Sequence, residues 1–427
     1  MASSFFLGLD FGTSGARACV IAENGEIEEF AKLGFGNLAD FELAASWRNA
    51  LFDLLADLPA GLRKRLAAIA LDGTSATVLA CDEALNPTYA PLLYNDARAR
   101  PEAELIGRAA GNSHPAATAT SGLAKALWLR RHLPNGRTHL FLNQADWLTG
   151  LLSELPGISD YHNALKMGFE PGGSAWPDWV GHLVDMDSLP NVVPPGSPIG
   201  MLSRPRARNL GIPLDCLVRT GTTDSIAAFL ASGASQPGEA ITSLGTTLVL
   251  KLVSERRVDD ARHGVYSHWY GKYWLAGGAS NAGGGVLRQY FNDHDLAELS
   301  TRIDPHSASG LEYYPLPSPG ERFPVNDPDM PPRLEPRPAE PARFLHGLLE
   351  GLANIEARGY EKLAEMGANR LGRVLSCGGG ASNPVYSRIR ERRLRVPTGT
   401  AAHQEAAYGS ARLARHGICL FPGMCDD

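Results

Sequence analysis

Short apolar runs that end in small and polar residues recur along this chain. Phe5–Leu9 is apolar and long enough for a buried strand, and Arg17–Ala22 is again β-prone. Between them lie Asp10 and the turn Gly12-Thr13-Ser14-Gly15, where glycines permit positive φ angles. The pattern predicts a strand, a turn and a second strand, with a carboxylate at the end of the first strand. Taken alone, this stretch also fits an ordinary β-hairpin with a glycine-rich turn.

The same pattern returns in the second half of the chain. Residues Ala240–Leu250 comprise an apolar strand, the turn Gly245-Thr246-Thr247 and another apolar strand. Backbone amides and hydroxyl groups in such turns donate to phosphate oxygens, and a carboxylate such as Asp10 suits Mg²⁺. Two well-separated phosphate-binding hairpins predict two related lobes that hold one nucleotide.

Other periodic segments predict an α/β fold. Strands are expected at Glu26–Leu33, Leu66–Leu71 and Thr77–Cys81, and helices at Trp47–Leu58, Leu123–Leu133, Gln144–Leu155 and Phe344–Leu363. A break near Ala231–Pro237 divides the chain into an N-terminal domain, 1–231, and a C-terminal domain, 232–427. The last helix, from about 405, is expected to end near Arg415 before a tail, and it can pack back on the N-terminal domain.

Composition narrows the functional classes. The 427 residues are 44% hydrophobic and 20% charged with a net charge of −6, which leaves room for two or three domains. This mild acidity argues against non-specific nucleic-acid binding. Six scattered cysteines without a C-x-x-C pair favour reduced cysteines over a disulfide framework. With neither a signal peptide nor a membrane-length apolar run, we expect a cytoplasmic monomer or homodimer without membrane partners.

Several polar groups stand where ligands bind in open α/β sheets. Asp72-Gly73-Thr74-Ser75 follows an apolar strand, although a capped turn explains these four residues equally well. Asn95-Asp96-x-Arg98 offers donors and acceptors for a polyol, or begins a helix. His162 has no second residue at metal-ligand spacing, which favours a hydrogen-bonding or structural role.

Asp224 has two interpretations. It follows Gly221-Thr222-Thr223 and lies at the start of the apolar helix Ile226–Ala231, where aspartate is a good N-cap. The functional alternative is a general base in a cleft, beside the point where a sugar hydroxyl meets a γ-phosphate.

Two glycine-rich turns mark the C-terminal half. Gly277-Gly278 precedes one of them, and Gly378-Gly379-Gly380 follows the strand-like run Arg373–Cys377. Consecutive glycines are unfavourable unless backbone must lie close to a ligand. Asn383 and Tyr386, just beyond, can contact the edge and face of a purine.

The common nucleotide and hydrolase motifs are absent from the sequence. It contains no G-x-x-x-x-G-K-[ST], G-x-S-x-G, H-E-x-x-H or G-x-G-x-x-G pattern. The features that the sequence does contain are two Gly-Thr turns, the acids Asp10 and Asp224, and the Gly378-Gly379-Gly380 turn. This combination suits Mg-ATP bound in a cleft. Phosphoryl transfer depends mostly on positioning and charge neutralisation and needs no protein nucleophile.

Together these motifs resemble the FGGY family of carbohydrate kinases. The resemblance spans nearly the full length and rests on Asp10–Ser14, Gly221–Asp224, Ser243–Thr247, Gly277-Gly278 and Gly378–Asn383. It implies two ribonuclease H-like domains of the actin/hexokinase superfamily, with a ligand cleft between them. Within the family, the chain looks most like the short, xylulokinase-like branch of cyanobacteria and plants, which implies conversion of D-ribulose to D-ribulose 5-phosphate.

The resemblance also implies roles for individual residues. Asp224 would be the catalytic base, and Asp10 would bind substrate and help place Mg²⁺. The phosphates would be held by Thr13, Ser14 and Thr246, and the sugar would contact Ser75. The nucleotide would bind at Gly278, Gly379 and Asn383, with Tyr386 stacking near adenine.

Two departures from the family pattern bear on the sugar. The chain is shorter than typical members, and residues 72–77 differ from the usual xylulose- and glycerol-contacting loop. D-xylulose or another polyol or ketose therefore stays an alternative substrate. A slow ATPase that acts as a sugar sensor or switch is the alternative from another class.

Overall fold

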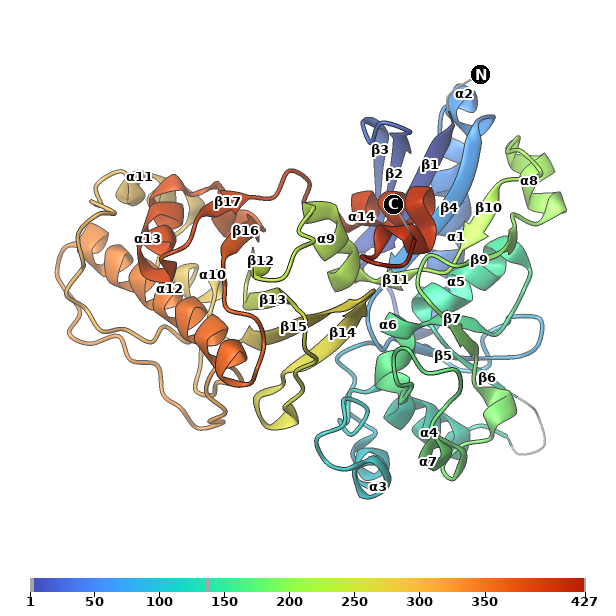
Figure 1. Ribbon diagram of the computed structural model, residues 1–427, viewed down its shortest axis with the longest axis horizontal. Coiled ribbons are helices and arrows are strands. Elements are labelled where there is room, and N and C mark those ends of the chain that lie inside the picture. The colour runs from blue at the N-terminus through green and yellow to red at the C-terminus, as the bar shows by residue number, and fades with distance from the viewer. Residues whose placement is uncertain (1–3, 135–138, 426–427) are drawn as a thin grey trace. The chain divides into compact units, whose positions relative to one another are not determined.

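The computed structural model describes residues 4–134 and 139–425, and the chain divides into two compact units. Unit 1 comprises Met1–Ala231 together with Glu405–Asp427, and unit 2 comprises Ser232–Gln404. Figure 1 labels the elements of both. Over the described residues, no helix has both the length and the apolar character needed to cross a membrane.

Unit 1 is built on a mixed sheet in the order β3-β2-β1-β4-β10-β9, with β11 also paired to β4. Its strands are β1 (Phe5–Phe11), β2 (Gly15–Ala22), β3 (Ile27–Gly34), β4 (Leu66–Gly73), β9 (Pro198–Met201), β10 (Leu217–Arg219) and β11 (Thr222–Thr223). β1, β2 and β3 form an antiparallel meander, whereas β4 runs parallel to β1. The predicted first hairpin and third strand are confirmed. The apolar residues of β1 and β2 fill the core, whereas β3 is partly exposed and packs against that core through Ala31 and Leu33.

Helices and two short ribbons complete unit 1. The helices are α1 (Leu43–Asp57), α2 (Ala60–Arg63), α3 (Arg100–Ala110), α4 (Gly122–His132), α5 (Gln144–Ser153), α6 (Tyr161–Ala164), α7 (Asp178–Gly181), α8 (Arg204–Leu210), α9 (Asp224–Ser232) and α14 (Ala406–His416). The ribbons pair β5 (Val78–Cys81) with β6 (Leu140–Asn143), and β7 (Ile158–Asp160) with β8 (Asn191–Val193). Trp47 and Leu51 of α1 are buried in the same core as Leu7 and Leu9 of β1.

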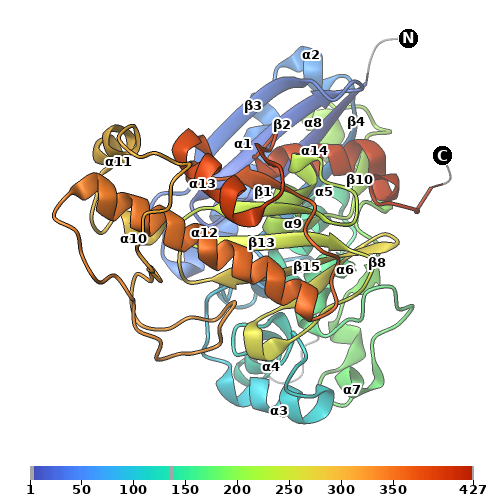
Figure 2. The same ribbon diagram turned by 60° about the vertical axis from the view of Figure 1, so that its left-hand side comes forward.

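Unit 2 contains a second mixed sheet, in the order β14-β15-β13-β12-β16-β17. Its strands are β12 (Glu239–Leu244), β13 (Leu248–Ser254), β14 (Tyr266–Tyr270), β15 (Tyr273–Ser280), β16 (Arg373–Cys377) and β17 (Thr398–Thr400). Its helices are α10 (Gly284–Leu287), α11 (Asp293–Ser300), α12 (Pro341–Glu365) and α13 (Pro384–Leu394). The long helix α12 lies along this sheet (Figure 2), and its buried leucines belong to the same core as those of β12 and β13.

The two sheets repeat one topology. In each, a hairpin and one further strand lie side by side and antiparallel, and a later strand then pairs parallel with the first strand. This applies to β1, β2, β3 and β4 in unit 1 and to β12, β13, β15 and β16 in unit 2. In unit 2 the edge strand β14 comes between β13 and β15 along the chain. The internal repeat that the two glycine-threonine turns predicted is therefore present in these four strands of each sheet.

The C-terminal helix α14 packs on β1 at very short range. A Cβ atom on Gly8 would lie 2.0 Å from the Ala407 carbonyl oxygen, and one on Gly409 would lie 1.9 Å from the Ala227 carbonyl oxygen. Glycine at these two positions lets α14 approach both β1 and α9. Figure 1 shows α14 beside the first strands of unit 1.

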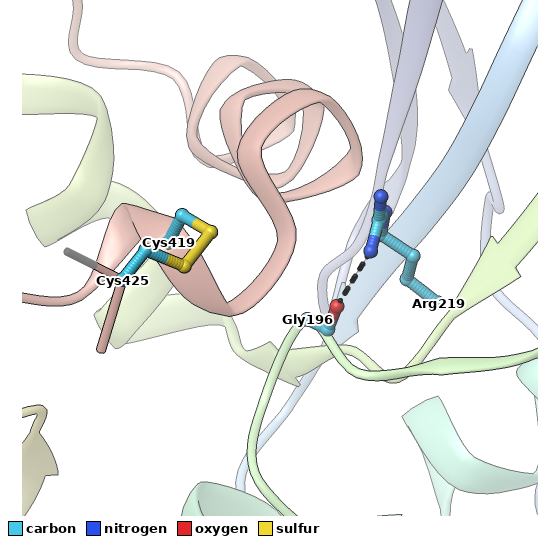
Figure 3. Close-up of a disulfide and its surroundings, with 4 residues drawn as sticks. All are labelled: Gly196, Arg219, Cys419 and Cys425. Atoms are coloured by element: carbon cyan, nitrogen blue, oxygen red, sulfur yellow. Dashed lines mark hydrogen bonds between the residues drawn. A yellow bond between two sulfur atoms is a disulfide. The ribbon is translucent and has the colours of Figure 1, made fainter. Parts of the chain in front are cut away.

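Two expectations for the chain end were wrong. Instead of an unstructured tail, α14 is followed by a 3₁₀ turn, Gly417–Leu420, and by Phe421, which is buried. Cys419 and Cys425 form a disulfide (Figure 3), whereas the other four cysteines are free and buried. Arg219 holds the loop beside this segment by donating from Nη1 to the Gly196 carbonyl oxygen over 3.1 Å.

Candidate functional site

Three neighbouring strands of unit 1 bring acidic and hydroxyl side chains to one edge of the sheet. Asp10 of β1 is in register with Asp72 of β4, which is in turn in register with Thr222 of β11. Side chains in register on parallel strands lie on the same face, so the two carboxyl groups are adjacent. Asp10 is 4% exposed and Asp72 is fully buried.

Asp72 is the most deeply placed of these acids. Burial raises its pKa well above the ordinary value, and the nearby Asp10 and Asp224 carboxylates raise it further. Ser410 of α14 donates to Oδ2 of Asp72 over 2.7 Å, whereas Oδ1 has no hydrogen-bond partner among the described residues. Burial and the neighbouring Asp10 and Asp224 carboxylates therefore favour the protonated form of Asp72 within this cluster of three carboxyl groups.

Asp10 is held by an arginine from the same hairpin. Asp10 and Arg17 face each other across β1 and β2, and Arg17 Nη1 lies 2.8 Å from Oδ2 of Asp10. The ion pair fixes the carboxylate at the mouth of the turn. Sequence reasoning named Asp10 and missed Arg17, although their equal distance from the Gly12–Gly15 turn already places them opposite each other.

The turn of this hairpin is tight and exposed. The Gly12 amide donates to the Gly15 carbonyl oxygen over 3.1 Å, and the side chains of Thr13 and Ser14 are exposed. A Cβ atom on Gly15 would lie 2.4 Å from the Leu33 carbonyl oxygen, so the close approach of β3 requires glycine there. The hydroxyl groups and amides of the turn are thus presented to solvent in a fixed conformation.

The loop after β4 carries Ser75, which is half-buried. Thr74 and Thr77 share a 2.6 Å hydrogen bond between their hydroxyl groups, and the Thr74 amide donates to Oε1 of Gln144. Ala76 has a φ of 61°, an unfavourable conformation for a residue with a side chain. The loop is therefore held in one strained shape by its neighbours.

Asp224 begins α9 directly after β11 and is half-buried. Its Oδ1 accepts from the Ser225 amide over 2.6 Å. His162 is buried and shares a 2.7 Å hydrogen bond with the Thr222 hydroxyl, which agrees with the hydrogen-bonding role expected for it. A half-buried carboxylate on a well-fixed strand end can both accept a proton and meet a ligand.

Unit 2 contains a pocket of about 680 Å³ between the β12–β13 turn, α11, α12 and the start of α13. The expected nucleotide residues Thr246, Gly379, Asn383 and Tyr386 all line it. Residues that sequence reasoning did not select also contribute to the lining, among them Leu287, Arg288, Asp293, Ser300, Leu349 and Leu352. The pocket combines an apolar interior with polar groups at its walls, which is typical of small-molecule sites.

At each of the three consecutive glycines beside this pocket, a different feature of the structure explains why the residue has no side chain. Gly378 has a φ of 83°, and a Cβ atom on Gly380 would lie 2.9 Å from the Leu244 Cβ. A Cβ atom on Gly379 would meet no atom within 4 Å, so protein packing does not explain this glycine. Because Gly379 lines the pocket, the open space there leaves room for a ligand close to the backbone.

Asn383 connects two walls of the pocket. Its Oδ1 caps α13 by accepting from the Val385 and Tyr386 amides, and its Nδ2 donates to the Ser300 hydroxyl over 2.8 Å. Tyr386 is buried, and its hydroxyl has no hydrogen-bond partner among the described residues. Asn383 therefore fixes the shape of the pocket as well as contributing to its surface.

Both halves of the chain match models of one protein family. Residues 5–231 match the N-terminal domain of the FGGY family of carbohydrate kinases, and residues 240–418 match its C-terminal domain. The chain belongs to the FGGY family of carbohydrate kinases. It is therefore an ATP-dependent carbohydrate kinase, and the predicted two-domain α/β, actin-like fold is confirmed.

Individual FGGY relatives are distant. A xylulose kinase from Staphylococcus epidermidis is 23% identical over 447 residues, covering 99% of this chain and 89% of the relative. A gluconokinase from Bacillus subtilis is 23% identical over 368 residues, covering 77% and 70%. The crystal structure of a xyloylose kinase from Brucella ovis superimposes with a TM-score of 0.84 at 23% identity, covering 97% of this chain and 90% of that one.

One expected nucleotide residue of this FGGY kinase lies outside the pocket lining. Gly278 is in the middle of β15, where a Cβ atom would lie 2.8 Å from the Phe323 ring. Packing against Phe323 explains the glycine without a ligand. Sequence reasoning grouped Gly278 with the nucleotide residues because a glycine pair looks the same whether a ring or a phosphate lies beside it.

Proposed function

We propose that this FGGY kinase transfers the γ-phosphoryl group of ATP to a hydroxyl of a ketopentose, with D-ribulose as the substrate and D-ribulose 5-phosphate as the product. The observation that carries the proposal is Asp224, a half-buried carboxylate held at a strand end beside Asp10 and Asp72. A sensor that only binds nucleotide needs no such group, whereas a kinase needs a base for the sugar hydroxyl.

In the proposed reaction, Asp224 accepts the proton of the attacking hydroxyl. The freed oxygen then attacks the γ-phosphorus, the bond to the bridging oxygen breaks, and ADP leaves. Asp10 and Ser75 would orient the sugar, while Thr13, Ser14 and Thr246 would hold phosphate oxygens. Apart from this proton transfer, the protein contributes position and charge, as expected for phosphoryl transfer.

Magnesium would be held chiefly through Asp10. No cluster of three or more His, Cys, Asp or Glu side chains suited to a metal occurs among the described residues. This donor set fits Mg²⁺ in a kinase, because the ion commonly takes one or two carboxylates and completes its coordination with phosphates and water. When bound, it neutralises the charge of the phosphates.

The nucleotide would occupy the unit 2 pocket. Gly379 would allow phosphate or ribose close to the backbone, and the Tyr386 ring would lie near adenine. Gly278 has no place in this proposal because Phe323 accounts for it.

The charge of the unit 1 cluster favours a neutral sugar over a sugar acid. Asp10 and Asp224 both act on Asp72, and the Arg17 ion pair offsets only the charge of Asp10, so a carboxylate on the substrate would meet like charge at Asp224. Ketopentoses avoid this repulsion, whereas gluconate does not. The choice of D-ribulose over D-xylulose rests on the resemblance to the short branch of the family, and the altered loop at residues 72–77 keeps D-xylulose as the alternative.

The substrate is tested by an ADP-release assay with Mg-ATP. The panel contains D-ribulose, D-xylulose, L-ribulose, L-xylulose, ribitol, glycerol, sedoheptulose and gluconate. The highest kcat/KM is expected for D-ribulose. A higher kcat/KM for D-xylulose would show that D-xylulose, not D-ribulose, is the substrate. Slow ADP release that no sugar accelerates would favour the alternative of a slow ATPase that acts as a sugar sensor.

The base is tested by Asp224→Ala, with Asp215→Ala as the matched control because Asp215 is exposed at the surface of the same unit. Removing a general base lowers the rate by about 10²–10⁴-fold, so Asp224→Ala is expected to lose phosphorylation by that factor. Calorimetry should show ATP binding close to wild type in both variants. Turnover near wild type in Asp224→Ala would contradict the assignment.

A further inference from the structure

Lys125 is a buried amine in α4, on unit 1. Its side chain is fully buried, and the ion pairs of the described residues do not include it. Burial lowers its pKa to about 7, while the Asp96 carboxylate in its vicinity acts in the opposite direction. Burying an amine that contacts no acid is unfavourable. A buried lysine such as Lys125 therefore indicates a specific structural or functional role.

The Lys125 ammonium joins two backbone segments that are distant in the sequence. Its Nζ donates to the Ala76 carbonyl oxygen over 2.8 Å and to the Leu93 carbonyl oxygen over 2.6 Å. Ala76 directly follows Ser75, and Leu93 precedes the Asn95–Arg98 segment that offers groups for a polyol. A single side chain thus holds the ends of two loops that carry candidate sugar contacts.

One of the two anchored residues has an unfavourable backbone conformation. Ala76 has a φ of 61°, a conformation that costs a residue with a side chain about 1 kcal/mol and persists only where the surroundings hold it. Beyond the anchor, Val78 and Leu92 exchange two backbone hydrogen bonds, of 3.0 and 2.9 Å, which align the rest of the two segments. Lys125 therefore links the two segments once more, at Ala76 and Leu93, next to this backbone pairing.

We propose that Lys125 is a positioning residue that sets the distance between the Ser75 loop and the Asn95–Arg98 segment, and thereby the fit of the sugar. The proposal rests on the proposed function, because it takes these two loops as walls of the sugar site. It assigns no contact between Lys125 and the substrate.

The first test compares Lys125→Met with Lys64→Met. Methionine keeps most of the volume of lysine but has no donor for the two carbonyl groups, and Lys64 is an exposed control. A displacement of about 1 Å in a binding wall can cost about 10²-fold, so the KM for D-ribulose and D-xylulose should rise by about 10-fold or more. The KM for Mg-ATP should stay within about 2-fold, since its pocket lies in unit 2. An unchanged sugar KM, or an equal rise in both KM values, would overturn the proposal.

Hydrogen exchange gives a readout that does not depend on turnover. In Lys125→Met, residues 73–77 and 93–96 should exchange faster than in the wild type, while β1 and β4 keep their protection. Unchanged exchange in both segments would also overturn the proposal, even if no sugar is a substrate. A wild type that phosphorylates none of the sugars would instead refute the proposed function.

A second variant covers the case in which Lys125→Met does not fold. Lys125→Gln keeps two N–H donors at slightly shorter reach, so it should fold and show a sugar KM between those of wild type and Lys125→Met. As the conservative variant, it should also restore part of the protection at residues 73–77. A folded Lys125→Gln with wild-type sugar KM and wild-type exchange in both segments would contradict the role.

Discussion

At the scale of single residues, unit 1 buries two further acids that the proposed reaction does not use. Asp146 of α5 and Asp160 at the end of β7 are both buried, and burial raises their pKa values to about 8 and about 7. Asp146 accepts from the backbone amide and side-chain amide of Asn143. The folded protein therefore holds protons at neutral pH that the unfolded chain releases above about pH 4.

This difference predicts a pH-dependent stability. Because the folded state binds more protons than the unfolded state, the free energy of unfolding should fall as pH rises from about 4 to about 8. Asp146→Asn mimics the neutral acid, so it should raise the melting temperature at pH 8 and leave it nearly unchanged at pH 5. Thermal melts at both pH values test this, with the exposed Asp53→Asn as the control. Equal shifts at both pH values would contradict the assignment.

The sequence predicted those site residues whose neighbours along the chain form a recognisable pattern. Asp10 and Asp224 stand beside apolar runs, so their place at strand ends follows from the pattern itself. The contact between Ser410 and Asp72 spans 338 residues and has no local signature. Gly278 shows the opposite problem, since a local signature that suggested a ligand arises from packing against Phe323.

At the scale of elements, the close packing of α14 predicts the effect of a single methyl group. Gly8→Ala would place a Cβ atom 2.0 Å from both the Ala407 carbonyl oxygen and the Ala411 amide nitrogen. Such overpacking costs about 1–3 kcal/mol or more, because backbone has to move. Chemical denaturation should show this loss. Gly61→Ala, in a helix with open space around the position, should instead be neutral or stabilising by up to about 1 kcal/mol.

Most longer elements were predicted to within a few residues. The helix expected at Gln144–Leu155 is observed as Gln144–Ser153, and the strand expected at Leu66–Leu71 as Leu66–Gly73. These segments have clear apolar periodicity. The two-residue strand β11 and the 3₁₀ turn after α14 are too short to have a period, and they form because neighbouring strands and helices already hold them.

At the scale of the whole molecule, unit 1 is assembled from two separate stretches of chain. Residues 405–427 contribute α14, which covers Gly8 and supplies the Ser410 bond to Asp72. Deleting residues 405–427 should therefore abolish the thermal transition of unit 1 and leave that of unit 2. Differential scanning calorimetry tests this, with Ser410→Ala as the control that removes one hydrogen bond at a cost of about 1 kcal/mol. Loss of both transitions would contradict the independence of unit 2.

The split construction of unit 1 has a consequence for biosynthesis. A ribosome delivers residues 1–231 first, then all of unit 2, and only afterwards the helix that β1 and α9 are shaped to receive. Domains generally fold as they emerge, in order from the N-terminus. Here the domain translated first waits for residues 405–427, with the surface of β1 at Gly8 still uncovered, while the domain translated between these two stretches can already be complete.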